Sequence, residues 1–179
     1  MQVLASVNYH VQKDEAQAFE FDVDGIVGNL VSPELVTTAI AVTDLRDKPR
    51  PNRFDQDGIV FVDQAAEVQD FTATQDWEQV YDAELKQLLS SQIGAEEVIV
   101  FDHTVRIDDP NAPRRPARNV HNDYNQAGAE QRLVDIVGEE RAQAFHEAGY
   151  GFVNVWRPIE HEIQSSPLGF IRPSSMIAE

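Results

Sequence analysis

The sequence contains no cysteine among its 179 residues. This absence excludes disulfide bonds, thiolate zinc sites and cysteine nucleophiles, and it is compatible with a reducing cytoplasm, where we expect the protein to act. The sequence also lacks any apolar run near the ~20 residues that a membrane-spanning helix needs. Its first six residues contain no basic region leading into an apolar segment, so we expect no secretory signal and no membrane partner.

Basic residues are scarce. Fourteen Lys and Arg oppose 31 Asp and Glu, which gives a formal net charge of −17. A field of this sign repels nucleic acid and anionic membranes, so we predict no nucleic-acid partner. The basic residues form two local groups, and the second can hold a carboxylate-bearing small molecule or simply neutralise neighbouring acids. The members of the two groups are Lys48, Arg50 and Arg53, and then Arg106, Arg114, Arg115 and Arg118.

Two further motifs are missing. No glycine-rich phosphate loop lies between a strand and a helix, which argues against a doubly wound nucleotide-binding fold. No Gly-x-Ser-x-Gly elbow is present, so a hydrolase that used His121 as base and Asp123 as its orienter would lack a nucleophile.

The length fits a single domain over residues 1–179. Its patterns predict an α+β fold or half of a β-sandwich, with a β-rich portion over residues 1–70 and a helix followed by further strands over 71–179. We expect loops at 47–57 and 107–117, and helices at 76–92 and at 127–148, the latter broken near Gly138. The predicted strands are 1–10, 18–23, 34–43, 58–62, 98–101, 152–157 and 168–171, of which 34–43 and 98–101 read as buried.

Three ring-bearing residues read as part of the core. Trp77 and Tyr81 lie on the apolar stripe of the helix at 76–92, which favours packing over a ligand cage. His103 follows a predicted buried strand, and a hydrogen-bonded core histidine is favoured there over a metal ligand.

The segment that carries the most chemistry contains His121 and Asp123. On an extended strand, residues i and i+2 project to the same face, so the two side chains can offer a nitrogen and an oxygen to one metal ion. Together they make two thirds of the two-His-one-carboxylate triad of non-haem Fe(II) oxygenases. With five His and 31 acidic residues, a structural or surface pair arising by chance is the alternative.

Several motifs in a fixed order resemble the CmcJ/NvfI-like oxygenases, a family that includes the cephamycin 7α-hydroxylase component and fungal gibberellin desaturases. The resemblance covers about residues 70–170 well and the first 60 loosely. The motifs are Tyr81-x-x-Glu84, Gly94-Ala95, Val100-Phe101-Asp102-His103-Thr104-Val105-Arg106, Pro116-Ala117, Val120-His121-Asn122-Asp123-Tyr124, Arg132 and Asn154-Val155-Trp156-Arg157-Pro158-Ile159.

The resemblance implies a double-stranded β-helix (jelly-roll) core with flanking helices. It also implies non-haem Fe(II) as the metal, 2-oxoglutarate as cosubstrate, and hydroxylation or desaturation of a small natural-product-type metabolite. In this family His121 and Asp123 would be the first two iron ligands, and Tyr124 would line the pocket beside the metal.

Three residues are candidates for holding the cosubstrate carboxylates. Asn154 would bond to one of them or, alternatively, to its own backbone. Arg157 would bond to a cosubstrate carboxylate or, alternatively, pair with an acid such as Glu160. Arg118 belongs to the basic group just ahead of His121.

The chain departs from the family at its end. The family's third ligand and its cosubstrate-binding Arg lie on late strands, whereas this chain ends at Glu179. Only His146 and His161 follow Asp123, and His161 is the candidate third ligand. The resemblance therefore implies an incomplete jelly-roll core with weak iron binding, for which inactivity is one expectation. A non-catalytic small-molecule-binding or assembly protein is the alternative, and a homo-oligomer stays open.

Overall fold

The structure is a computed structural model that describes residues 1–11, 13–14, 34–44, 53–71 and 77–176. The strand predicted at 18–23 and the basic residues Lys48 and Arg50 lie outside the described residues.

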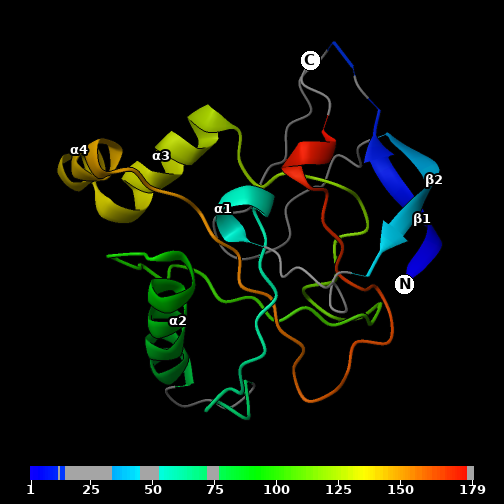
Figure 1. Cartoon of the computed structure of the whole chain (residues 1–179), viewed down its shortest axis with the longest axis horizontal. Coiled ribbons are helices and arrows are strands. Elements are labelled where there is room, and N and C mark those ends of the chain that lie inside the picture. Colours follow the sequence, from blue (N-terminus) through cyan, green and yellow to red (C-terminus); the bar gives the residue numbers. More distant parts are fainter. Residues whose placement is uncertain (12, 15–33, 45–52, 72–76, 177–179) are drawn as a thin grey trace.

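A β-hairpin-like sheet forms one end of the molecule (Figure 1). Its antiparallel strands are β1 (Gln2–His10) and β2 (Leu35–Thr43), in a register that pairs Gln2 with Thr43 and His10 with Leu35. Val, Ile and Thr side chains favour this pleated conformation. Both predicted strands are confirmed, but the prediction that the second is buried is wrong. Residues 35–39 are all exposed, and since successive side chains point to opposite faces, neither face of this half of β2 is covered by the described part of the chain.

The other edge of β1 holds the segment 118–120. The Val120 amide donates to the Asn8 carbonyl over 2.8 Å, and the Asn8 side-chain amide donates to the Arg118 carbonyl over 2.8 Å. The Asn8 side-chain oxygen accepts from the Thr37 hydroxyl of β2 over 2.7 Å. Asn8 therefore ties both neighbours of β1 together, and the residues just before His121 lie along the sheet.

The long helix α2 (Trp77–Ile93) confirms the helix predicted at 76–92. Gly94 ends it as expected, because its φ of +70° lies in the left-handed region that favours glycine. A short helix, α1 (Phe54–Asp57), was not predicted and falls within the expected loop at 47–57. Asp57 stabilises its start by accepting from the Arg53 amide.

The second helical region is broken at Gly138, as predicted. It consists of α3 (Gln126–Val137) and α4 (Glu139–Ala148), and Gly138 between them has a φ of +81°. The Asn125 side chain caps α3 by accepting from the Gly128 amide over 2.7 Å. A 3₁₀ turn, η1 (Pro173–Ser175), completes the described elements.

Four predicted strands are absent from the part of the chain that the structure describes, namely those at 58–62, 98–101, 152–157 and 168–171. A strand is defined by the ladder of hydrogen bonds to a neighbour, and none of these segments forms one with a described partner. The burial predicted for 98–101 is also wrong, since Phe101 is 42% exposed. The loop predicted at 107–117 is confirmed.

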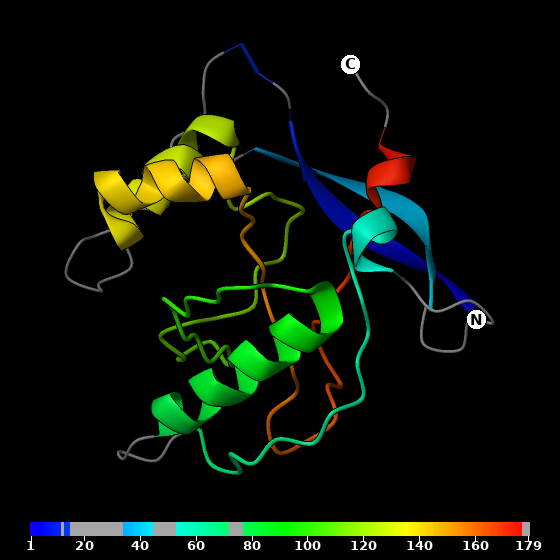
Figure 2. The same ribbon diagram turned by 60° about the vertical axis from the view of Figure 1, so that its left-hand side comes forward.

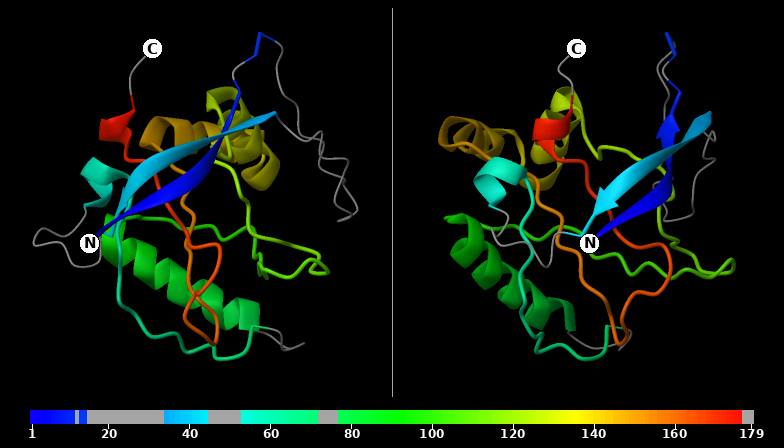
Figure 3. Two further views of the ribbon diagram at one scale, coloured as in Figure 1. Left: turned by 90° about the vertical axis from the view of Figure 1, so that its right-hand side faces the viewer. Right: turned by 45° about the vertical axis from the view of Figure 1, so that its right-hand side comes forward.

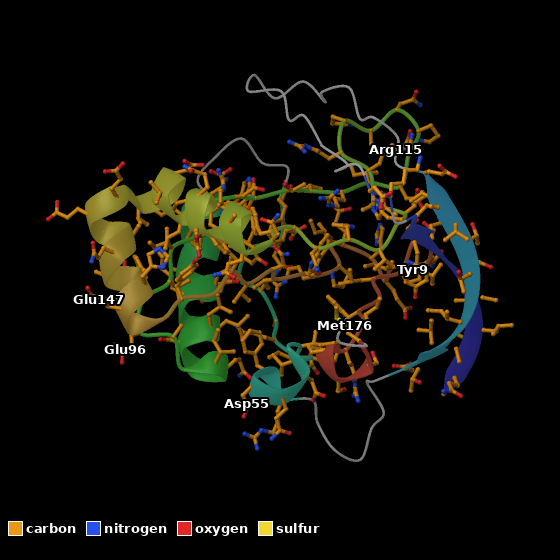
Figure 4. The ribbon with its side chains drawn as sticks, turned by 90° about the horizontal axis from the view of Figure 1, so that it is seen from above. Tyr9, Asp55, Glu96, Arg115, Glu147 and Met176 are labelled. Atoms are coloured by element: carbon orange, nitrogen blue, oxygen red, sulfur yellow. The ribbon has the colours of Figure 1, made fainter. Side chains whose placement is uncertain are left out.

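Helices α2, α3 and α4 lie away from the hairpin, whereas α1 and η1 lie side by side nearer to it, and long segments without regular structure connect these parts (Figures 2 and 3). In Figure 4, Tyr9 and Arg115 lie at the sheet end, while Glu96 and Glu147 lie at the helical end. Of the helices that the structure describes, none is both long and apolar enough to cross a membrane.

The main core lies against α2. Tyr81 and Leu85 of the helix are buried with Val68, and Phe71, Trp77 and Val100 pack on them. The Tyr81 and Phe71 rings meet edge to face with centroids 5.1 Å apart. His103 completes this cluster as the predicted core histidine, because its Nε2 lies 2.8 Å from Asp82 Oδ1 and its ring packs on Trp77.

A polar cluster at Asp108 ties the 107–117 loop to the C-terminal region. Its carboxylate accepts from the Ser165 and Ser166 hydroxyls, each over 2.8 Å, and from Arg118 over 2.6 Å. The two serine hydrogen bonds, and then Arg118, hold the pKa of Asp108 below its ordinary value.

This shift predicts a pH-dependent effect of Asp108→Asn. A carboxyl whose pKa is lowered on folding stabilises the native state above the pKa of the unfolded chain and stops doing so as pH falls through the folded value. We therefore expect Asp108→Asn to lower the midpoint of urea unfolding at pH 7, and the difference from wild type to be smaller at a second, acidic pH below the ordinary aspartate pKa of ~3.9. Asp63→Asn, at an exposed carboxylate without a described partner, should leave the midpoint unchanged. An equal difference at both pH values would contradict the prediction.

Candidate metal-binding site

His121 and Asp123 lie together at the surface, just beyond the segment that follows β1. His121 Nε2 is 3.5 Å from Asp123 Oδ1, and the side chains are 41% and 46% exposed. Two donor atoms at this separation can bind one ion, since metal–nitrogen and metal–oxygen bonds of ~2.1 Å span up to ~4.2 Å together. The pairing expected from the i and i+2 spacing is therefore present.

The orientation of the His121 ring leaves one nitrogen free for a metal. His121 Nδ1 lies 2.9 Å from the carbonyl oxygen of Asn119. A carbonyl can only accept, so Nδ1 carries the hydrogen, and Nε2 of the neutral ring presents a lone pair toward Asp123. Histidine ligands in metal sites are oriented in the same way, by a hydrogen bond from the nitrogen that does not bind the metal.

A hydrogen bond from Asn154 orients the Asp123 carboxylate. The Asn154 side-chain amide donates to Asp123 Oδ2 over 2.6 Å, which leaves Oδ1 facing His121. This contact differs from both predicted partners of Asn154, the cosubstrate carboxylate and its own backbone. Asn154 therefore belongs to the site as a residue that orients the carboxylate.

The sequence reasoning missed the residues that position this site from β1. The Asn119 side chain lies 2.8 Å from His10 Nε2, and the amide after Asn119 bonds to the Asn8 carbonyl. Asn8 and His10 share one face of an otherwise largely apolar strand, since they are two residues apart. This pair of polar residues was the signal in the sequence that could have indicated a contact between β1 and the site.

The structure brings no third ligand to the pair from the residues it describes. No group of three His, Asp or Glu side chains there has the arrangement to hold a metal ion. His161, the predicted third ligand, is 87% exposed and has Glu160 as its nearest carboxylate, at 4.0 Å. The assignment of His161 as the third ligand stays a prediction, and its exposed position does not favour it.

Both candidate arginines make their contacts elsewhere. Arg118 pairs with Asp108. Arg157 lies over the Tyr81 ring, donates to the Gln64 carbonyl over 3.1 Å and has Glu84 at 3.9 Å, so the expected pairing with Glu160 is replaced by one with α2.

Tyr124 directly follows Asp123, and its ring packs on Phe152 with centroids 4.9 Å apart. A surface hollow of about 390 Å³ lies elsewhere, over α3 and α4, and none of the predicted site residues lines it.

Asn154→Ala should weaken metal binding without abolishing it. Losing a residue that only orients a ligand costs about 10–100-fold in metal affinity. We expect a loss of this size in an anaerobic Fe(II) titration. Asn122→Ala is the matched control, because Asn122 lies between the two ligands and has no described hydrogen bond. Equal affinity for the two variants would contradict the role of Asn154.

Comparison with known proteins decides the family. The family described as "Oxidoreductase/YMDC permease-like domain" matches residues 7–179. The chain belongs to this oxidoreductase family. No solved structure matches the chain significantly.

Curated fungal relatives agree with an oxygenase-like oxidoreductase family. "Oxidoreductase clz16" of Cochliobolus lunatus is 31% identical over 109 residues, which cover 55% of this chain and 37% of that protein. "Alpha-ketoglutarate-dependent dioxygenase phiK" of a fungal species (strain ATCC 74256) is 26% identical over 140 residues, covering 73% and 49%. "Hydroxylase/desaturase CTB9" of Cercospora beticola is 29% identical over 103 residues, covering 49% and 32%. The chain thus spans about a third to a half of the length of these relatives.

Proposed function

We propose that this chain carries the His-x-Asp part of a non-haem Fe(II) site in a 2-oxoglutarate-dependent oxygenase of the CmcJ/NvfI-like type, which hydroxylates or desaturates a small metabolite. One observation carries the proposal: His121 Nε2 and Asp123 Oδ1 face each other at 3.5 Å. Two lone-pair donors in this arrangement repel unless a proton or a cation lies between them. The name of phiK, an alpha-ketoglutarate-dependent dioxygenase, supports 2-oxoglutarate as the cosubstrate, and the name of CTB9 supports hydroxylation or desaturation as the reaction.

The proposal includes a fold. The segment 118–120 bonds to the free edge of β1, so three chain segments lie side by side at the sheet end. This arrangement supports an incomplete jelly-roll core in one domain over residues 1–179, with the metal ligands just beyond a core segment. The helices α2, α3 and α4 would flank that core.

The chain's own residues have defined tasks in this proposal. His121 and Asp123 hold the metal, while the Asn119 carbonyl and the Asn154 amide fix their orientation. Bound iron, with 2-oxoglutarate and O2, supplies the oxidation of an unactivated C–H bond. Arg118 would have to leave Asp108 before it could bind a cosubstrate carboxylate, and Tyr124 stands next to the metal-binding carboxylate in the sequence.

The direct test is formation of succinate. The purified chain, supplied with Fe(II), 2-oxoglutarate and O2, should release succinate, and omission of either iron or 2-oxoglutarate should stop the release. Succinate formation that continues without added iron in the presence of a chelator would contradict the proposal.

The alternative is a non-catalytic small-molecule-binding or assembly protein of the same ancestry. It is favoured by the missing third ligand among the described residues and by exposed apolar side chains on the hairpin, such as Leu4 at 79%. This alternative predicts no succinate and a stable oligomer in sedimentation analysis.

A further inference from the structure

Four aromatic rings gather beside the candidate metal site. Phe152 is the centre, and its ring centroid lies 5.8 Å from that of Phe101, 4.9 Å from Tyr124 and 6.1 Å from Tyr150. Phe101 and Tyr150 meet Phe152 nearly edge to face, at 87° and 90°. We call these four residues the ring cluster.

The helical pair explains why these rings meet. Tyr124 lies just before α3 and Phe152 just after α4, and the chain reverses between the two helices at Gly138 (Figures 1 and 2). The reversal returns the end of α4 to the start of α3. The cluster adjoins the metal site on two sides, since Tyr124 follows Asp123 and Phe152 precedes Asn154 by two residues.

The ring cluster is open to solvent. Phe101, Tyr124 and Tyr150 are 42%, 37% and 36% exposed, and Phe152 at the centre is partly buried. Aromatic rings dominate binding energetics because each offers a large apolar face at low cost in conformational entropy. An incoming flat ring can therefore bury area here that the protein leaves uncovered.

An unneutralised cation lies at the edge of the cluster. The Arg132 guanidinium is 5.2 Å from the centroid of the Phe101 ring. Among the described residues, Arg132 forms no hydrogen bond and no ion pair. Arg141 provides the contrast, because it lies 5.7 Å from the Phe145 ring centroid but pairs with Glu97.

We propose that the ring cluster and Arg132 form a binding surface for a small organic anion with a flat aromatic ring system. The ring would pack on the cluster while its carboxylate or similar group pairs with Arg132. A second copy of this chain is the less suitable occupant, because the repulsion between two copies that each carry a charge of −17 far exceeds that between one copy and a singly charged anion. Binding of such an anion to this surface does not depend on the proposed oxygenase function. The further step, that this anion is the substrate of the oxygenase, rests on the proposed function.

The test uses 2-naphthoate as the probe, with neutral 2-naphthylmethanol for comparison, in equilibrium titrations at a fixed salt concentration. We expect wild type to bind 2-naphthoate more tightly than 2-naphthylmethanol. Arg132→Gln should weaken 2-naphthoate at least about tenfold while leaving 2-naphthylmethanol unchanged, since only the charged contact is lost. Phe101→Leu should weaken both probes.

Two control variants separate this surface from other parts of the protein. Arg141→Gln removes the other ring-stacked arginine and should bind both probes as wild type does. Asp123→Ala disables the proposed metal site and should also retain binding, so that failure of the oxygenase function and failure of this surface are distinguishable. Equal affinity of wild type for the two probes, or equal losses in Arg132→Gln and Arg141→Gln, would overturn the proposal.

Discussion

His121→Ala and Asp123→Ala should each abolish the iron- and 2-oxoglutarate-dependent release of succinate. Each substitution removes one of the two protein donors to the metal and leaves the other alone, so the affinity for Fe(II) should fall steeply. We expect succinate formation to drop by at least about 100-fold, the upper end of the cost of losing a residue that only orients a ligand. The assay follows succinate under identical iron and 2-oxoglutarate concentrations.

His146→Ala is the matched control for these variants. His146 lies on α4, packs on the Tyr150 ring and makes no described contact with either ligand. It removes one histidine without touching the proposed site, so activity should stay at the wild-type level. Circular dichroism should show the same helical content for all three variants, because His121 and Asp123 lie outside the helices. Wild-type succinate formation in His121→Ala would remove His121 from the site.

Leu85→Ala should cause the largest loss of stability among simple truncations. Leu85 is 8% exposed and packs with Val68 and Tyr81 in the cluster that joins α2 to the rest of the chain. Truncating a buried leucine costs about 2–5 kcal/mol, because transfer free energy is lost and a cavity remains. Few residues share this core, so little else can compensate. Urea unfolding followed by tryptophan fluorescence measures the change.

Val80→Ala tests whether the effect comes from burial or from the helix itself. Val80 belongs to the same helix but is 44% exposed. Alanine has the higher helix propensity, so this variant should differ from wild type by no more than about 0.5 kcal/mol. Equal destabilisation by Leu85→Ala and Val80→Ala would show that the cluster around α2 is not the stabilising core.

Helices and their ends were predictable because they depend on local chemistry. The stripe containing Tyr81 and Leu85, the stop at Gly94 and the break at Gly138 all follow from residues within one or two turns of one another. Burial of β2 and the four further strands were predicted wrongly from apolar, β-branched composition. Such composition reports that a segment can pair or be covered, but the partner is set by distant parts of the chain.

The same distinction holds at the site. The pairing of His121 with Asp123 was predicted, because it depends on spacing alone. The bond from Asn154 to Asp123 crosses 31 positions, and the attachment of Asn119 to His10 crosses 109, so neither could be derived from local pattern. Arg157 was expected near the cosubstrate, yet Glu84 and the Tyr81 ring hold it against α2.

The most direct test of the account is the iron content of the chain under anaerobic equilibrium dialysis. We predict that wild type binds one Fe(II) per chain and that a His121→Ala/Asp123→Ala double variant binds none at the same free iron concentration. Binding of equal amounts of iron by the two proteins, or the absence of iron from wild type at saturating concentration, would contradict the assignment of His121 and Asp123 as metal ligands.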